Sequence, residues 1–255
     1  MIAPSKAPLL LLAIAVVIAV VAFLIQPIPQ PQSYHNFADH RAWLGIPNFG
    51  DVASNVAFAI VGFWGLIVLF MPQAVQFADS RERLPYVVMF FGMILTAFGS
   101  AYYHLAPDNA RLVWDRLPMT IVFMSLIAAV IAERVSVRAG LVLLPLLLIV
   151  GAASVLQWRE SELQGHGDLR FYAMVQVYAV LVLLLMMLVR SKYTRGADFA
   201  MVVAFYVLAK VLEETDRQVF ALGHIASGHT LKHLAAAAAG YWILRMLQKR
   251  KIALN

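Results

Sequence analysis

The chain has 255 residues, of which 62% are hydrophobic and 13% are charged, and its mean hydropathy is +0.78. A soluble domain carries about 25% charged residues and presents a polar surface to water. The composition therefore excludes a soluble globular protein and predicts an integral membrane protein. The absence of cysteine excludes disulfides and thiolate metal sites. The net charge of +6 is spread between apolar segments rather than along one stripe, so we expect no nucleic-acid partner.

Apolar runs of about 20 residues, the length of a helix that crosses a bilayer, recur eight times. We expect transmembrane helices over residues 8–26, 51–71, 85–105, 117–133, 139–157, 171–189, 199–221 and 229–247. The first run is longer than the apolar part of a signal peptide and lacks a nearby cleavage site, which favours a retained helix. The expected fold is all-α: one N-terminal helix (residues 1–30) and a seven-helix membrane domain (residues 31–255).

Basic residues are divided unequally between the two ends of this predicted bundle. Twelve of them fall on the side of the N-terminus and five on the other side, which predicts that both termini are cytoplasmic. Short loops and the lack of cysteine favour a bacterial inner membrane. The twelve are Lys6, Arg81, Arg83, Arg134, Arg138, Arg190, Lys192, Arg195, Arg245, Lys249, Arg250 and Lys251, and the five are Arg41, Arg111, Arg116, Arg159 and Arg170.

Polar residues at three predicted helix ends indicate a site, because ionisable groups inside a membrane are costly. Ser100 and His104 are four residues apart and share one helix face. Asp115 precedes the next helix, and His229 and His233, again four apart, begin the last one. Alternating helix directions place all five at the non-cytoplasmic side. Three imidazoles with an open position are typical of catalytic zinc, and a nearby aspartate can orient a ligand or take a proton from zinc-bound water.

Each of these residues also has an ordinary explanation when it is taken alone. A histidine at a helix end is usually an interfacial residue, and a serine such as Ser100 usually packs between helices. The convergence of all five at one side is what favours a metal site.

These residues resemble the motifs of the alkaline ceramidase family, within a superfamily of seven-helix membrane hydrolases that includes the progestin and adiponectin receptors. The resemblance implies an intramembrane zinc amidase that hydrolyses the N-acyl bond of ceramide or a related lipid, giving a long-chain base and a fatty acid. It implies that His104, His229 and His233 hold zinc. Asp115 would be the general base, and Ser100 would help to bind the metal or stabilise an oxyanion. The matching pieces are Ser54-Asn55, Gly99-Ser100-x-x-x-His104, Asp115-x-Leu117-Pro118-Met119 and His229-x-x-x-His233.

A calcium site is a second implication of the resemblance, because animal members carry one in an acidic segment before the Ser-Asn helix. Here Asp39, Asn48 and Asp51 offer oxygen ligands for calcium. The acidic density is lower than in those members, and the spacing does not match cleanly.

Charged residues in the seventh predicted helix suggest internal pairing. Lys210 and Glu214, and likewise Glu213 and Arg217, are four residues apart. A polar wall that contacts a lipid headgroup is the functional alternative. Lys232 lies on a different helix face from the histidines, and we expect it to extend outward to the interface.

Two functions without catalysis stay open. The first is a receptor or regulatory protein on the same scaffold, with a structural zinc ion. The second is a transporter or channel in which the charges of the seventh helix form an ion pathway. A pathway requires acidic residues throughout the membrane depth, whereas the histidines gather at one end, which disfavours this second alternative.

Overall fold

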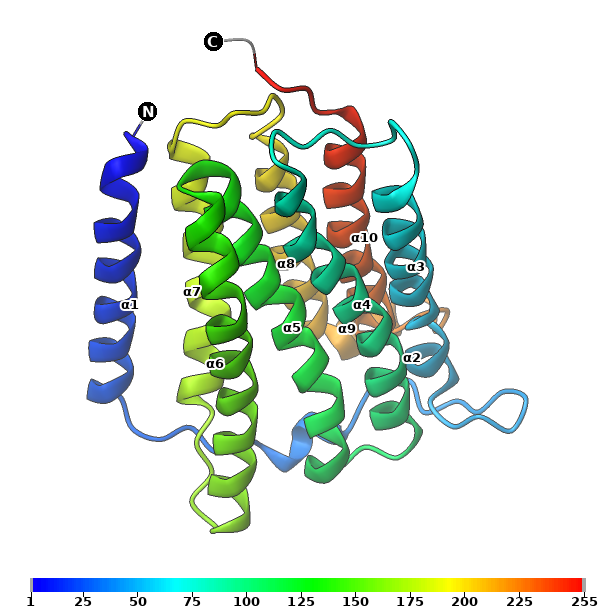
Figure 1. Cartoon of the computed structure of the whole chain (residues 1–255). Helices are drawn as coiled ribbons and strands as arrows, with labels where there is room; N and C mark the ends of the chain where they lie inside the picture. The colour runs from blue at the N-terminus through cyan, green and yellow to red at the C-terminus, as the bar shows by residue number, and fades with distance from the viewer. Residues whose placement is uncertain (1, 254–255) are drawn as a thin grey trace.

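The computed structural model describes residues 2–253, which form a bundle of roughly parallel helices (Figure 1). Within these residues only isolated β-bridges occur beside the helices, so the predicted all-α class is confirmed. Each of the eight predicted runs overlaps one long helix. The long helices are α1 (Ala7–Leu24), α3 (Val56–Phe70), α4 (Arg83–Leu105), α5 (Asn109–Arg134), α6 (Val137–Leu163), α7 (Arg170–Leu188), α8 (Asp198–Glu214) and α10 (Gly228–Lys249). The short ones are η1 (Pro4–Lys6), η2 (Gln32–His35), α2 (Phe49–Ala53), η3 (Ser80–Glu82) and α9 (Asp216–Ala221).

Six helical segments are long and apolar enough to cross a membrane. They make this chain an integral membrane protein, as the composition predicts. Helix α8 is shorter and α10 begins with a polar stretch, so neither belongs to the six. The six are Pro4–Leu24, Phe49–Phe70, Ser80–Leu105, Asn109–Arg134, Val137–Leu163 and Arg170–Leu188.

Polar caps define where several helices begin. The Asp108 carboxylate accepts a hydrogen bond from the Arg111 backbone N–H (2.7 Å), so α5 begins well before the apolar run of residues 117–133. Ser227 caps α10 in the same way, by accepting from the Thr230 backbone N–H (2.9 Å). This cap starts α10 just before its two histidines.

Helices α4 and α5 approach closely where the sequence has a glycine and a proline. Pro118 has no N–H to donate to the carbonyl of Trp114, four residues earlier. Gly99 of α4 lies directly against that carbonyl, and a Cβ at Gly99 would overlap the oxygen. Glycine therefore permits the contact that brings the end of α4, with Ser100 and His104, beside the start of α5.

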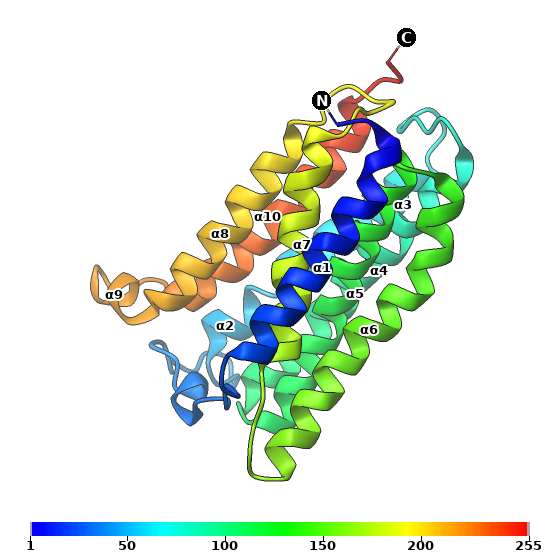
Figure 2. The same cartoon turned by 90° about the vertical axis from the view of Figure 1, so that its left-hand side faces the viewer.

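Helix α1 lies along the outside of the bundle and packs mainly on α7 (Figure 2). The Arg170 guanidinium, at the start of α7, donates to the carbonyls of Ala22 (3.1 Å) and Ile25 (2.7 Å) at the end of α1. A cation at a helix C-terminus satisfies free carbonyls and stabilises the helix dipole. The C-terminal end of α1 is therefore attached to α7 by polar contacts.

Candidate metal centre

Three histidines from two helices meet inside the bundle. His104 lies in the last turn of α4, and His229 and His233 lie one turn apart at the start of α10. All three are buried, and one ring nitrogen from each lies within 4.8 Å of the others. The structure thus brings the three predicted ligands together, and the cluster can bind a metal ion.

The hydrogen bonding of the three rings fits a metal at their centre. Among the described residues, both ring nitrogens of His104 and Nε2 of His229 are buried without a hydrogen-bond partner. Leaving a buried polar atom unpaired costs about 1–3 kcal/mol. His233 Nδ1 is 2.8 Å from Ser54 Oγ, and Ser54 Oγ donates to the Asp51 carbonyl (3.1 Å). Ser54 therefore accepts the Nδ1 proton, which leaves His233 Nε2 as the ligand atom.

Replacement of Ser54 by alanine should weaken metal binding without removing a ligand. Loss of a group that orients a metal-bound histidine typically costs about 10–100-fold in affinity. Titration against a competing chelator measures this change. Ser154→Ala is a matched control, because Ser154 is also buried but donates to the Gly151 carbonyl within α6. Unchanged affinity in Ser54→Ala would exclude the orienting role.

Two carboxylates position the start of α10. Asp51 Oδ1 accepts from Thr230 Oγ1 (2.7 Å), and Asp216 Oδ1 accepts from the His229 backbone N–H (2.7 Å). The other oxygen of Asp216 accepts from the Ala38 backbone N–H (2.8 Å). Acidic groups at a helix N-terminus satisfy free N–H groups and stabilise the dipole. These contacts fix the helix turn that carries His229.

A segment between α1 and α2 covers the cluster; we call residues 26–40 the strap. Phe37 is buried, and its ring centroid lies 4.8 Å from that of His104 and 4.4 Å from that of His229. Tyr34 donates from its hydroxyl to Glu213 (2.9 Å). The strap therefore covers the histidine cluster at the end of the bundle opposite the termini (Figure 1).

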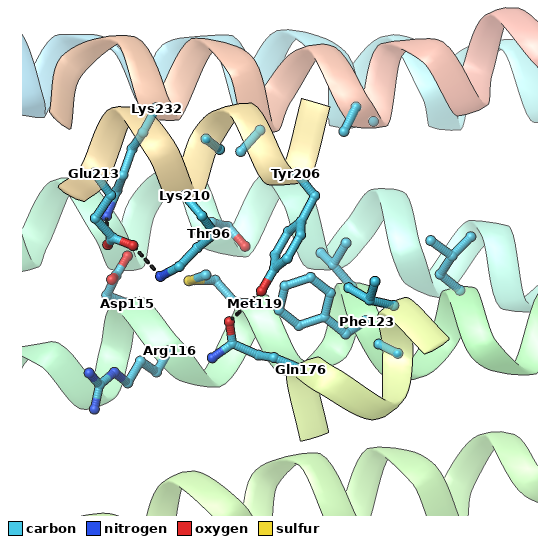
Figure 3. Close-up of a pocket in the computed structure, with 18 of the residues that line it drawn as sticks. Thr96, Asp115, Arg116, Met119, Phe123, Gln176, Tyr206, Lys210, Glu213 and Lys232 are labelled. Atoms are coloured by element: carbon cyan, nitrogen blue, oxygen red, sulfur yellow. Dashed lines mark hydrogen bonds and ion pairs between the residues drawn. The ribbon is translucent and has the colours of Figure 1, made fainter. Parts of the chain in front are cut away.

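A cavity of about 390 Å³ extends from the cluster into the bundle, between α4, α5, α7, α8 and α10 (Figure 3). His233, Ser100 and Asp115 line its polar end, and Ser100 Oγ is buried without a partner among the described residues. The remaining wall is largely apolar, as at Met93 and Leu183. The predicted site residues Ser100 and Asp115 thus face the same space as the histidine cluster.

Glu213 is the charged centre of this polar end (Figure 3). It pairs with Lys232 (2.6 Å) and with Lys210, so the pairs that the spacing predicts are not formed. Helix α8 ends at Glu214, which breaks the helical register that a bond between Glu213 and Arg217 requires. Lys232 does not extend outward: its side chain is 15% exposed and lines the cavity. A buried carboxylate such as Glu213 requires compensating positive charge, and Lys232 supplies it in addition to Lys210.

The predicted calcium ligands all contact protein groups. Both carboxylate oxygens of Asp39 accept from Arg41 (2.8 and 2.7 Å), and these bonds hold the pKa of Asp39 below its usual value. The Asn48 amide donates to the His104 carbonyl (2.8 Å), and Asp51 is bound to the start of α10. Calcium binding by Asp39, Asn48 and Asp51 stays a prediction.

A protein-family model described as the dsRNA-gated channel SID-1 matches residues 8–242. The match runs from α1 into α10 and is not confined to the metal-site motifs. The chain belongs to the SID-1 family. No curated protein matches the sequence.

Membership of the SID-1 family corrects the expected identity. Assignment to the alkaline ceramidases is wrong, and so are the zinc hydrolase class, the cleavage of ceramide and a role in sphingolipid metabolism. The motifs that carried the resemblance lie where α4, α5 and α10 pack together, and they supply three histidines that could hold a metal ion. The same set of histidines can serve proteins of different function, so these residues alone do not identify the function.

The expected partners are corrected too. A ceramide-like lipid substrate and the exclusion of nucleic acid both conflict with a family named for gating by dsRNA. Membrane topology can account for the distribution of the basic residues, but it does not exclude a second role for the same residues. The channel alternative, disfavoured because the histidines gather at one end, agrees better with the family.

Proposed function

We propose that this protein is a membrane channel or transport component for double-stranded RNA, and that a bound metal ion holds its helices in register. The observation that carries the proposal is the family match over residues 8–242. The buried cluster of His104, His229 and His233 supports the metal, because one ring nitrogen from each lies within 4.8 Å of the others and Nε2 of His229 and both nitrogens of His104 lack a hydrogen-bond partner among the described residues.

The proposed topology is a seven-helix core preceded by α1. In this arrangement α8 and α10 cross the membrane together with the six apolar segments. The 22 residues of α10 span about 33 Å, which is sufficient for a bilayer core. The twelve basic residues at the end that carries both termini support a cytoplasmic location for that end. The metal centre then faces the non-cytoplasmic side of what we propose is a bacterial inner membrane.

Zinc is the metal that we propose for the three histidines, because it favours nitrogen ligands and tetrahedral coordination. The fourth position would face the cavity, where Ser100 and Asp115 can hydrogen-bond to a ligand or water. The ion would also strengthen the contact between α4, which packs mainly on α5 and α3, and α10, which packs mainly on α8 and α3. Zinc would thus join α4 directly to α10 and act as a clamp.

The cavity supports a closed conformation rather than an open path through one chain. Its volume of about 390 Å³ is that of a small-molecule pocket, far below what a nucleic-acid duplex requires. The strap covers its polar end, and Leu126, Ile127 and Ile243 form part of its apolar wall. Passage of RNA therefore requires either a rearrangement of the helices or a path shared by several copies.

Uptake of RNA by reconstituted vesicles tests the proposal. Vesicles that contain the zinc-loaded protein should protect labelled double-stranded RNA from external nuclease, and a DNA duplex of equal length serves as the comparison. Stripping the metal, or replacing His229 and His233 by alanine, should abolish the protection. Protection no greater than in empty vesicles would overturn the RNA role. Equal protection with and without metal would overturn the clamp.

A further inference from the structure

The two ends of the bundle carry opposite charge. The end that holds the metal centre has eight basic and ten acidic residues, a net charge of −2. The end that holds the termini has twelve basic residues but only Asp79, Glu82, Glu133 and Asp198 as acids, a net charge of +8. The whole positive excess of the chain therefore lies at one end of the molecule.

Three segments join at this positive end and build a continuous surface. The Ile2 backbone N–H donates to the Leu188 carbonyl at the end of α7 (2.7 Å), and the Ile2 carbonyl accepts from the Arg190 N–H (3.4 Å), which attaches the N-terminal segment to the start of the loop between α7 and α8. The same loop binds the C-terminal segment: the Thr194 N–H donates to the Lys251 carbonyl (2.9 Å), and the Ala253 N–H donates to the Lys192 carbonyl (2.8 Å). Backbone hydrogen bonds thus attach the N-terminal segment to one part of the loop and the C-terminal segment to another.

Exposed cations cover this surface, which we call the basic platform and define by six residues. Asp198 contacts Arg195 (2.7 Å), and Glu82 lies 3.7 Å from Lys192 but is itself fully buried. Lys6, Arg190, Lys249 and Lys251 are likewise exposed. The six residues are Lys6, Arg190, Lys192, Arg195, Lys249 and Lys251.

A buried ion pair supports the platform from below. Arg250, between the two exposed lysines of the C-terminal segment, turns inward and pairs with Glu133 of α5. Its guanidinium also lies 3.9 Å from the ring centroid of Tyr193, in the loop between α7 and α8. The inward anchor holds Lys249 and Lys251 at a fixed position beside Lys192, so the platform is preorganised.

We propose that the basic platform binds the phosphate backbone of double-stranded RNA. The inference rests on the proposed function and adds the surface that the RNA contacts. Phosphate contacts with Lys and Arg supply most of the sequence-independent affinity for a duplex. The metal end, at net charge −2, does not attract a polyanion. With the termini in the cytoplasm, the platform lies where RNA leaves the uptake path.

Binding of double-stranded RNA to the protein in nanodiscs of neutral phosphatidylcholine tests this inference. The neutral lipid removes anionic headgroups as competitors for the platform. In Lys249→Gln/Lys251→Gln, binding should weaken, and the slope of log affinity against log salt concentration should fall by about 2, one for each lost phosphate contact. Arg111→Gln/Arg159→Gln removes two charges at the metal end and should leave both quantities unchanged.

Cross-linking locates the contact independently, because the chain has no native cysteine. Ser5→Cys places a photo-reactive label beside the platform, and His166→Cys places it in the exposed loop between α6 and α7. We expect the RNA to cross-link to the first variant and not to the second. The reverse pattern would place the RNA at the metal end and overturn the inference.

The outcomes separate this inference from the proposed function. If wild type binds RNA and both double variants lose affinity equally, the platform is overturned while RNA binding stands. If wild type binds anionic vesicles but no RNA, the platform recognises membrane phosphates, and the RNA role of the protein is overturned as well.

Discussion

Replacing His233 by alanine should remove the metal and lower the melting temperature of the protein by about 8–16 °C. A ligand at about a thousand times its dissociation constant stabilises the folded state by about 4 kcal/mol. Each kcal/mol shifts the midpoint by roughly 2–4 °C in a chain of about 150–250 residues. Elemental analysis and thermal unfolding of the detergent-purified protein measure both effects. A chelator should lower the midpoint of wild type but not that of the variant.

His166→Ala is the control for this experiment, since His166 is exposed in the loop between α6 and α7. It should keep both the metal and the melting temperature of wild type. Full metal content in His233→Ala would show that the ligand set is wrong. A chelated wild type that melts at the same temperature as the loaded protein would show that the metal does not stabilise the bundle.

Removing either partner of the Glu133–Arg250 pair should lower the free energy of unfolding by about 3–5 kcal/mol. Both side chains are nearly fully buried, at 2% and 3% exposure, and the Tyr86 hydroxyl donates to the same Glu133 oxygen (2.8 Å). Deleting one charge leaves the other buried and unpaired, which is the main cost. Unfolding of Glu133→Leu and Arg250→Met in mixed micelles measures this change.

The double variant Glu133→Leu/Arg250→Met provides the decisive comparison. Replacing a buried pair by apolar residues is often close to neutral, so its loss should be well below the sum of the single losses. Arg81 pairs with Asp79 at 2.7 Å on the surface, and Asp79→Ala should change stability little. Additive losses in the double variant would show that Glu133 and Arg250 do not stabilise one another.

The helices followed from the sequence because apolar length and helix-ending residues carry that information locally. Their exact starts did not, since α5 begins at Asn109 through the Asp108 cap, before the apolar run. Hydropathy predicts which residues lie in the apolar part of the membrane, but a helix can begin before that part.

The histidine cluster was predictable because the spacing of four residues and the alternation of helix directions both constrain it. The contacts of Phe37, Ser54 and Lys232 were not. Phe37 reaches the cluster through an irregular strap, whose path has no periodic signal. Lys232 turns inward because Glu213 of another helix is buried beside it, and such a partner is visible only in three dimensions.

The function was the least predictable property. Residues at a metal site and at a close helix contact, such as Gly99 and Pro118, recur wherever the same packing is needed. Residues of this kind give little information about which partner the rest of the protein surface binds. The charge difference between the two ends was visible in the sequence, but the positive-inside rule explained it completely. The structure adds that these cations form one surface, built from three joined segments.

X-ray absorption at the zinc edge of the purified protein is the sharpest test of the three-histidine centre on which the proposed clamp depends. We expect about one zinc ion per chain, with three imidazole nitrogens at about 2.0–2.1 Å and one further light ligand. An absorption edge that is missing in carefully handled wild type, or a coordination shell of oxygen alone, would contradict it.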